Sequence, residues 1–130
     1  MKTKEVPTIA VFPEERLTLS EKIEKWVYEY CGSLDENYQL SYPNSHSNIE
    51  FKMQLGRKYW KILQHNIDAD GIHFSESVHA FVDKNTGEVY KPASYKAPAK
   101  GVRYDLRSIH QRHECFSNAD WSGSYLYLRG

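Results

Sequence analysis

Residues 49–55 alternate strictly between apolar and polar side chains, in the order Ile-Glu-Phe-Lys-Met-Gln-Leu. Successive side chains of a β-strand point to opposite faces, so this pattern predicts a strand with one buried and one solvated face. Such a strand needs a neighbouring strand to pair its backbone and a second layer to cover its apolar face. The chain is therefore expected to fold around a layered sheet.

The next residues supply a neighbour for this strand. Residues 56–57, Gly-Arg, can form a two-residue turn, because glycine tolerates the positive φ that such turns need. The chain then returns with Trp60 opposite Met53 and Ile62 opposite Phe51, which keeps one face apolar. The sequence thus predicts an antiparallel hairpin.

Further strands are expected downstream of this hairpin. Residues 66–76 are polar and are predicted to form a loop, and 78–82 read as the next strand. Residues 83–87, Asp-Lys-Asn-Thr-Gly, have turn chemistry, with the aspartate bonding turn amides and the glycine at positive φ. Residues 88–91 form the returning strand, and 124–128 are predicted to form a closing strand.

Two helices are expected, one N-terminal to the predicted strands of residues 49–91 and one C-terminal to them. Thr18 and Glu21 form a capping box, and Gly32 is placed to end the helix, so this helix is predicted over 19–31. A short strand is predicted over 38–42. The second helix is expected from Leu106 or Ser108 to Phe116. Apolar residues recur at helical spacing on one face of the first helix, namely Leu19, Ile23, Trp26, Val27 and Tyr30.

We therefore predict an α+β fold, with an N-terminal helix packed on a three- to five-stranded antiparallel sheet and a second short helix near the C-terminus. The 130 residues are expected to form a single domain, with 1–16 as an irregular N-terminal arm. No apolar run is long enough to cross a bilayer, and the N-terminus lacks the apolar region of a signal peptide. With two cysteines the chain is expected to be cytoplasmic and free of disulfides.

The net charge of zero conceals an uneven distribution. Residues 1–50 contain five Lys/Arg and nine Asp/Glu, whereas residues 84–112 contain seven Lys/Arg and two Asp/Glu. A local excess of five positive charges in a neutral protein indicates a focused anion site and not a polycation. We call residues 90–104 the basic arm.

The basic arm combines cations, tyrosines and prolines. Prolines stiffen it, which lowers the entropy lost when side chains are organised around a ligand. We predict Lys91, Lys96, Lys100 and Arg103 as phosphate contacts. We predict Tyr95 and Tyr104 as stacking surfaces, with His79 or Arg107 completing the site. The alternative is that the lysines are merely solvated and the tyrosines cover the edge of the sheet.

The expected ligand is a nucleotide or another phosphate-bearing molecule, bound without catalysis. A small nucleotide needs only two or three cations and a stacking partner, whereas proteins that coat nucleic acid are usually basic overall. Binding of single-stranded nucleic acid is the second hypothesis. A third is interaction with a protein, through a homo-oligomer interface or an inhibitory surface, because the tryptophans and the segment 125–128 exceed the needs of a small core.

Residues 77–106, SVHAFVDKNTGEVYKPASYKAPAKGVRYDL, resemble a motif in small proteins of tailed bacteriophages. The similarity begins near residues 56–62 and reaches 120–127, about half of the chain. The resemblance implies a virus-encoded accessory protein that works in the cytoplasm of an infected bacterium. It implies no activity. By analogy with small phage proteins that sequester nucleotide signals, the expected role is to counter host defence.

Metal binding and catalysis are not expected. His110 and His113 share a helix face, but Cys115 is displaced from it and no further ligand is apparent. Residues 68–71 resemble the start of a calcium loop, but Ile72 and Phe74 follow where oxygen ligands are needed, so a polar turn is predicted. No nucleophile elbow or phosphate-cradling glycine loop is present. We predict no catalytic residue, no metal and no cofactor.

Overall fold

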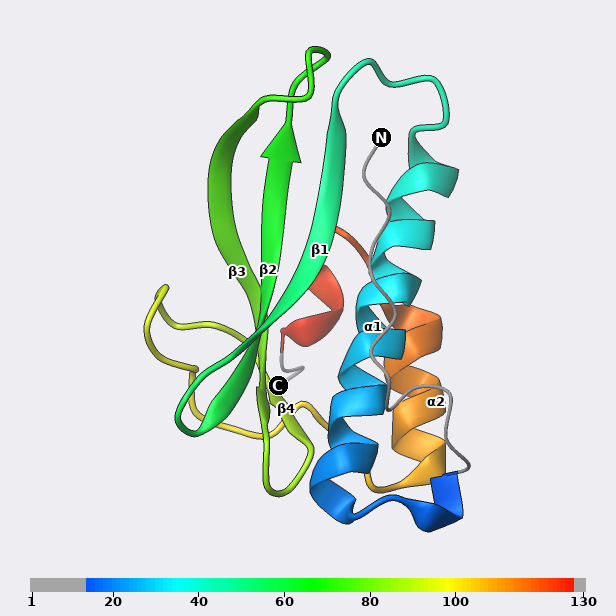
Figure 1. The fold of residues 1–130 in the computed structure, drawn as a ribbon, viewed down its shortest axis with the longest axis vertical. Helices are drawn as coiled ribbons and strands as arrows, with labels where there is room; N and C mark the ends of the chain where they lie inside the picture. Colours follow the sequence, from blue (N-terminus) through cyan, green and yellow to red (C-terminus); the bar gives the residue numbers. More distant parts are fainter. Residues whose placement is uncertain (1–13, 128–130) are drawn as a thin grey trace.

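The computed structural model describes residues 14–127 of the chain. Helices lie on one side of an antiparallel sheet (Figure 1), which confirms the predicted α+β architecture. The predicted N-terminal arm falls largely outside the described residues, and its last three residues form a short 3-10 helix. The elements in chain order are η2 (Glu14–Arg16), α1 (Leu19–Ser41), β1 (Asn48–Leu55), β2 (Tyr59–Ile67), β3 (His73–Asp83), β4 (Glu88–Tyr90), β5 (Tyr104–Asp105), α2 (Ile109–Asn118) and η3 (Ser124–Leu126).

The five strands follow one another in space in the order of the sequence, β1-β2-β3-β4-β5, and each pairs antiparallel with the next. The core lies between this sheet and α1, with contributions from α2 and η3. The largest fully buried side chains from α1 are Ile23, Tyr30 and Leu34, and they share one core cluster with Phe51 and Ile62 of the sheet. The apolar face predicted for residues 49–55 therefore packs against the helices and forms one side of the core.

Helix α1 begins as predicted and ends ten residues later than predicted. The Thr18 hydroxyl accepts from the Glu21 amide at 3.2 Å, and the Glu21 carboxylate accepts from the Thr18 amide at 2.9 Å. Gly32 does not end the helix, and the strand predicted over 38–42 is wrong. Leu34 and Tyr38 continue the buried stripe at helical spacing, and their packing outweighs the low helix propensity of one glycine.

Replacing Gly32 with alanine should stabilise the protein by about 0.5–1 kcal/mol. A methyl group at this position would meet no atom within 4 Å, and alanine loses less backbone entropy in a helix. Urea unfolding of both proteins measures the difference. Gly87→Ala is the control, since Gly87 has φ +78° and an added methyl would lie 3.4 Å from Ile23 Cγ1, so this variant should lose stability. A destabilised Gly32→Ala protein would contradict the prediction.

The β1–β2 hairpin forms, but its predicted register is wrong by two residues. Trp60 lies opposite Leu55 and Ile62 opposite Met53. The Gly56 amide donates to the Tyr59 carbonyl at 2.9 Å, so the turn residues are one position later than expected. A shift of two residues keeps every side chain on its predicted face, which is why the apolar pattern was compatible with both registers.

The β2–β3 hairpin is longer than predicted. The expected polar loop over 66–76 is wrong, because β2 continues to Ile67 and β3 already begins at His73. The turn between them is the polar turn expected near 68–71, where the Asp68 carboxylate accepts from the amides of Asp70 and Ile72, both at 2.9 Å. Strand pairing satisfies the backbone hydrogen-bonding groups of these additional residues, even though most of their side chains are polar and exposed.

A register shift in this hairpin determines where His79 lies. Ile62 pairs with Ala80 and Leu63 with Val78, so His79 is the extra residue of a β-bulge. Its ring contacts Phe51 edge-on, with 5.2 Å between centroids, and it is buried.

The turn over 83–87 is confirmed, because the Asp83 carboxylate accepts from the amides of Asn85 at 2.8 Å and Thr86 at 3.1 Å. Helix α2 is capped by the Ser108 hydroxyl, as the predicted start allowed, and ends two residues later than expected. The closing strand over 124–128 is wrong, since residues 124–126 form η3 and residue 128 lies outside the described part. Leu126 points into the core from η3.

The outer edge of β1 is covered in part by α1. The Phe51 amide points away from β2 and donates to the Asp35 carboxylate of α1 at 2.9 Å. Glu50 and Lys52, on either side of Phe51, form an ion pair with 3.7 Å between charged atoms. The edge strand is thus held to the helix by a side chain and not by a further strand.

Candidate functional site

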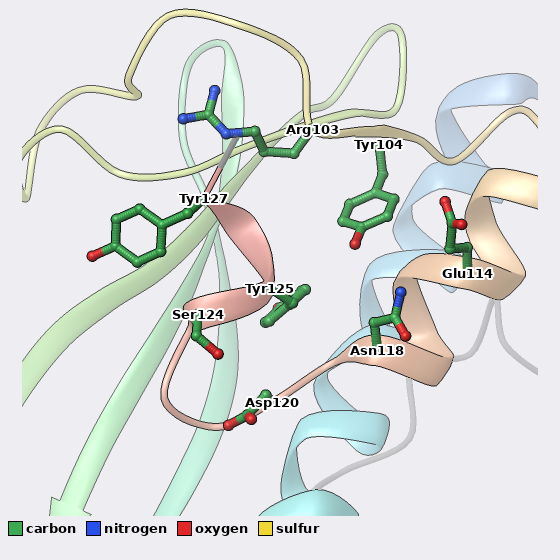
Figure 2. Close-up of a pocket in the computed structure, with 8 residues that line it drawn as sticks. All are labelled: Arg103, Tyr104, Glu114, Asn118, Asp120, Ser124, Tyr125 and Tyr127. Atoms are coloured by element: carbon green, nitrogen blue, oxygen red, sulfur yellow. The ribbon is translucent and has the colours of Figure 1, made fainter. Parts of the chain in front are cut away.

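A cavity of about 650 Å³ opens between the basic arm, α2 and the C-terminal segment (Figure 2). It has room for a ligand the size of a mononucleotide. Three segments from the last quarter of the chain supply its walls. The lining residues are Arg103, Tyr104, Glu114, Asn118, Asp120, Ser124, Tyr125 and Tyr127.

One end of the cavity is basic. Arg103 donates to three carbonyl oxygens, from Nε to Leu126 at 2.6 Å and from Nη1 to Lys100 at 2.7 Å and Gly101 at 2.6 Å. These bonds hold the guanidinium in place, and no carboxylate of residues 14–127 lies within ion-pair distance of it. Lys91 Nζ lies 4.8 Å from the centre of the Tyr127 ring, beside the same end. Two positive charges therefore flank one tyrosine.

The opposite end carries oxygen and amide groups. Glu114 and Asn118 lie one turn apart on α2 and so share a face of that helix. Figure 2 shows them across the cavity from Arg103 and Tyr127, with Asp120 and Ser124 along the wall between. The site is thus bipolar, with cations at one end and hydrogen-bonding oxygens at the other. The rings of Tyr104 and Tyr125 lie between the two ends.

A buried polar network supports the Tyr125 wall. The Tyr125 hydroxyl lies 2.8 Å from His79 Nε2 and 2.5 Å from the Tyr30 hydroxyl. The Cys115 thiol shares a hydrogen bond with Tyr30. The network thus joins the strand β3, both helices and η3 beneath the cavity.

Burial keeps this network uncharged at neutral pH. It lowers the pKa of His79 to about 4, an effect that the charge of Asp120 partly offsets. It raises the pKa of Cys115 to about 12 and raises the pKa values of Tyr30 and Tyr125 well above the usual range. A thiol with so high a pKa is a poor nucleophile. The network therefore supports the wall of the cavity and does not supply a reactive group.

Three of the eight residues predicted from the sequence meet at this cavity. Arg103 and Tyr104 line it, and Lys91 contacts its rim at Tyr127. His79 does not line the cavity and instead lies behind Tyr125. The remaining four are directed elsewhere and lie on the basic arm or just after it.

Those four residues do not line the cavity, two because other residues hold their side chains and two because they are exposed. Tyr95 lies on the outer face of the sheet, where Lys61 Nζ is 4.2 Å from the ring centre and Glu76 accepts from the tyrosine hydroxyl. Arg107 binds the Asp105 carboxylate through Nε and Nη2, at 3.0 and 2.7 Å. The side chains of Lys96 and Lys100 are exposed to solvent. The basic arm therefore does not gather all its cations around one point.

Six of the lining residues were not predicted from the sequence. Glu114 and Asn118 share a face of the expected second helix, which was a usable signal. Asp120 and Ser124 have no local pattern that indicates a site. Tyr125 and Tyr127 were assigned to the core or to an interface, since the segment was expected to be a strand.

Residues 11–128 match the model of a protein family that is described as a family of unknown function, DUF7717. The chain belongs to the DUF7717 family. The match extends over all of the described residues, including every residue that lines the cavity. No curated protein and no solved structure matches the chain significantly. Within residues 14–127, no helix combines the length and the apolar character needed to span a bilayer.

Proposed function

We propose that the protein binds a nucleotide with a single phosphate group in this cavity, without catalysing its conversion. The observation that carries the proposal is the bipolar cavity, with Arg103 at one end and Lys91 beside it, Glu114 and Asn118 at the other end, and Asp120 along the wall between. A mononucleotide likewise has one charged end and one end that forms hydrogen bonds. Its phosphate is an anion, and its sugar and base carry hydroxyl, amino and carbonyl groups.

The contacts at each end favour this orientation. Arg103 is fixed by three backbone carbonyls, so little entropy is lost when it receives a phosphate. Carboxylates such as Glu114 and Asp120 accept hydrogen bonds from sugar hydroxyls or base amino groups and would repel further phosphates. The tyrosines supply aromatic faces for a base. Two cations and two carboxylates therefore favour one phosphate over a polyphosphate.

The resemblance of residues 77–106 to a motif of tailed-phage proteins extends the proposal. We propose that the protein is a phage accessory protein that acts in the cytoplasm of the infected bacterium. Binding without turnover would lower the free concentration of a host nucleotide, which suits a protein that counters a nucleotide signal in host defence. The cyclic mononucleotides have one phosphate and belong to the ligand class that the cavity favours.

Nucleoside monophosphates, linear and cyclic, are expected to raise the melting temperature of the protein, because a ligand of the folded state stabilises it by mass action. Lys91→Met should lower the affinity for the best ligand by about tenfold, since it removes one charge-assisted contact worth about 1.4 kcal/mol. The same variant should leave the binding of the corresponding nucleoside unchanged. Thermal-shift screening followed by isothermal titration calorimetry measures both effects.

Lys96→Met is the matched control, because it makes the same substitution on the basic arm at an exposed position away from the cavity. It should bind like the wild type. Equal losses of affinity in the two variants would mean that the ligand is attracted by charge spread over the basic arm. A steep salt dependence of single-stranded DNA binding would then identify the protein as a nucleic-acid-binding protein. If no mononucleotide shifts the melting temperature, the proposal is wrong.

A further inference from the structure

His65 and His73 meet near the tip of the β2–β3 hairpin, and neither of them lines the cavity. Their Nδ1 atoms are 3.2 Å apart, and their rings are steeply inclined at 79°. In the strand register His65 lies opposite Glu76, and His73 lies opposite Ile67, so the two histidines are diagonal neighbours. With both rings neutral, one Nδ1 donates a proton to the lone pair of the other.

Glu76 determines which ring nitrogen of His65 carries the proton. Its carboxylate Oε1 lies 3.5 Å from His65 Nε2, and its other oxygen accepts from the Tyr95 hydroxyl. A carboxylate beside Nε2 favours the proton there and leaves the Nδ1 lone pair directed at His73. A carboxylate on the far nitrogen is also the usual support of a metal-bound histidine.

We propose that His65 and His73 form a binding site for a divalent first-row transition-metal ion, with Glu76 positioning His65. Two imidazole nitrogens bound tetrahedrally at 2.0–2.1 Å from one ion lie about 3.3 Å apart, close to the observed separation. For binding, His73 moves its proton from Nδ1 to Nε2, so both lone pairs face the ion and no net charge is lost.

The site has two protein ligands. Within residues 14–127 no three His, Cys, Asp or Glu side chains are grouped to hold one ion, so water fills the remaining positions. The order of affinities for such a nitrogen site places Cu²⁺ above Ni²⁺ and Zn²⁺. The site is independent of the nucleotide proposal, because none of its residues lines the cavity.

The test is titration of the purified protein with Cu²⁺ alone, followed by calorimetry and by electron paramagnetic resonance. His73→Ala should weaken Cu²⁺ binding at least tenfold and reduce the nitrogen hyperfine pattern from two imidazoles to one. His73 is exposed, so this substitution should leave the fold intact, as circular dichroism will check. Glu76→Gln should weaken binding by about tenfold and keep the two-nitrogen pattern, as expected of a positioning residue.

The rival site is the exposed pair His110 and His113 on α2, and the double variant His110→Ala with His113→Ala is the matched control. It should bind Cu²⁺ as tightly as the wild type. The proposal is overturned if the double variant loses the binding, if His73→Ala retains it, or if the wild type does not bind Cu²⁺.

Discussion

Phe51→Ala is expected to lower the free energy of unfolding by about 3–5 kcal/mol, a large part of the stability of a domain of this size. Phe51 is fully buried on β1, with 0% of its surface exposed. Its ring packs edge-on against His79, and its backbone amide is bonded to Asp35. Truncation removes the apolar contact and leaves a cavity that the strand cannot close, because its edge is tied to α1.

Urea or thermal unfolding of the variant measures this loss. Leu40→Ala is the control, since Leu40 lies on the outer side of α1 with 77% of its surface exposed and should change stability by less than about 0.5 kcal/mol. A loss below about 1 kcal/mol for Phe51→Ala would mean that this side chain does not fill the core as described. The space left by the missing Phe51 ring should also admit water to His79 and so raise the pKa of His79 toward the ordinary value.

The protein is expected to lose on the order of 3 kcal/mol of stability as the pH falls from about 6.5 to about 4, through His79 alone. Burial holds the pKa of His79 at about 4 in the folded protein, whereas the unfolded chain binds a proton near pH 6.5. Between these values the unfolded state carries the extra proton, so acidification favours unfolding. Above pH 6.5 the contribution is complete, and below pH 4 it changes no further.

His79→Gln isolates this contribution, because a glutamine amide can still bond the Tyr125 hydroxyl but does not titrate. The stability difference between wild type and variant, measured by urea unfolding from pH 4 to pH 8, should shrink steadily as the pH falls below 6.5. Carboxylates titrate in both proteins and cancel in the difference. A difference that is independent of pH would show that His79 is accessible to protons in the folded state.

The parts of the fold that were predictable carry local signals. The capping box at Thr18, the alternation over 49–55 and the Asp83–Gly87 turn each depend on residues that are close in sequence. The errors arose where distant contacts decide. Packing of Leu34 and Tyr38 carries α1 past Gly32, and backbone pairing extends the β2–β3 hairpin through polar residues.

The candidate site was predictable only in part for the same reason. The cations of the basic arm were identified, but the direction of Arg103 depends on a partner elsewhere in the chain, the Leu126 carbonyl. The orientation of His79 depends on a bulge that no residue pattern indicates. The far wall of the cavity comes from α2 and η3, whose position follows from core packing.

The bond between Asp35 and the Phe51 amide has a consequence for association between copies of the protein. An eight-residue strand at the margin of a sheet ordinarily offers its unpaired backbone groups to any other extended chain, which leads to fibrils and aggregates. Here a carboxylate occupies a donor in the middle of that margin, and an incoming strand would have to displace it and bury its charge. Helix α1 therefore protects the sheet from unwanted growth as well as covering its core.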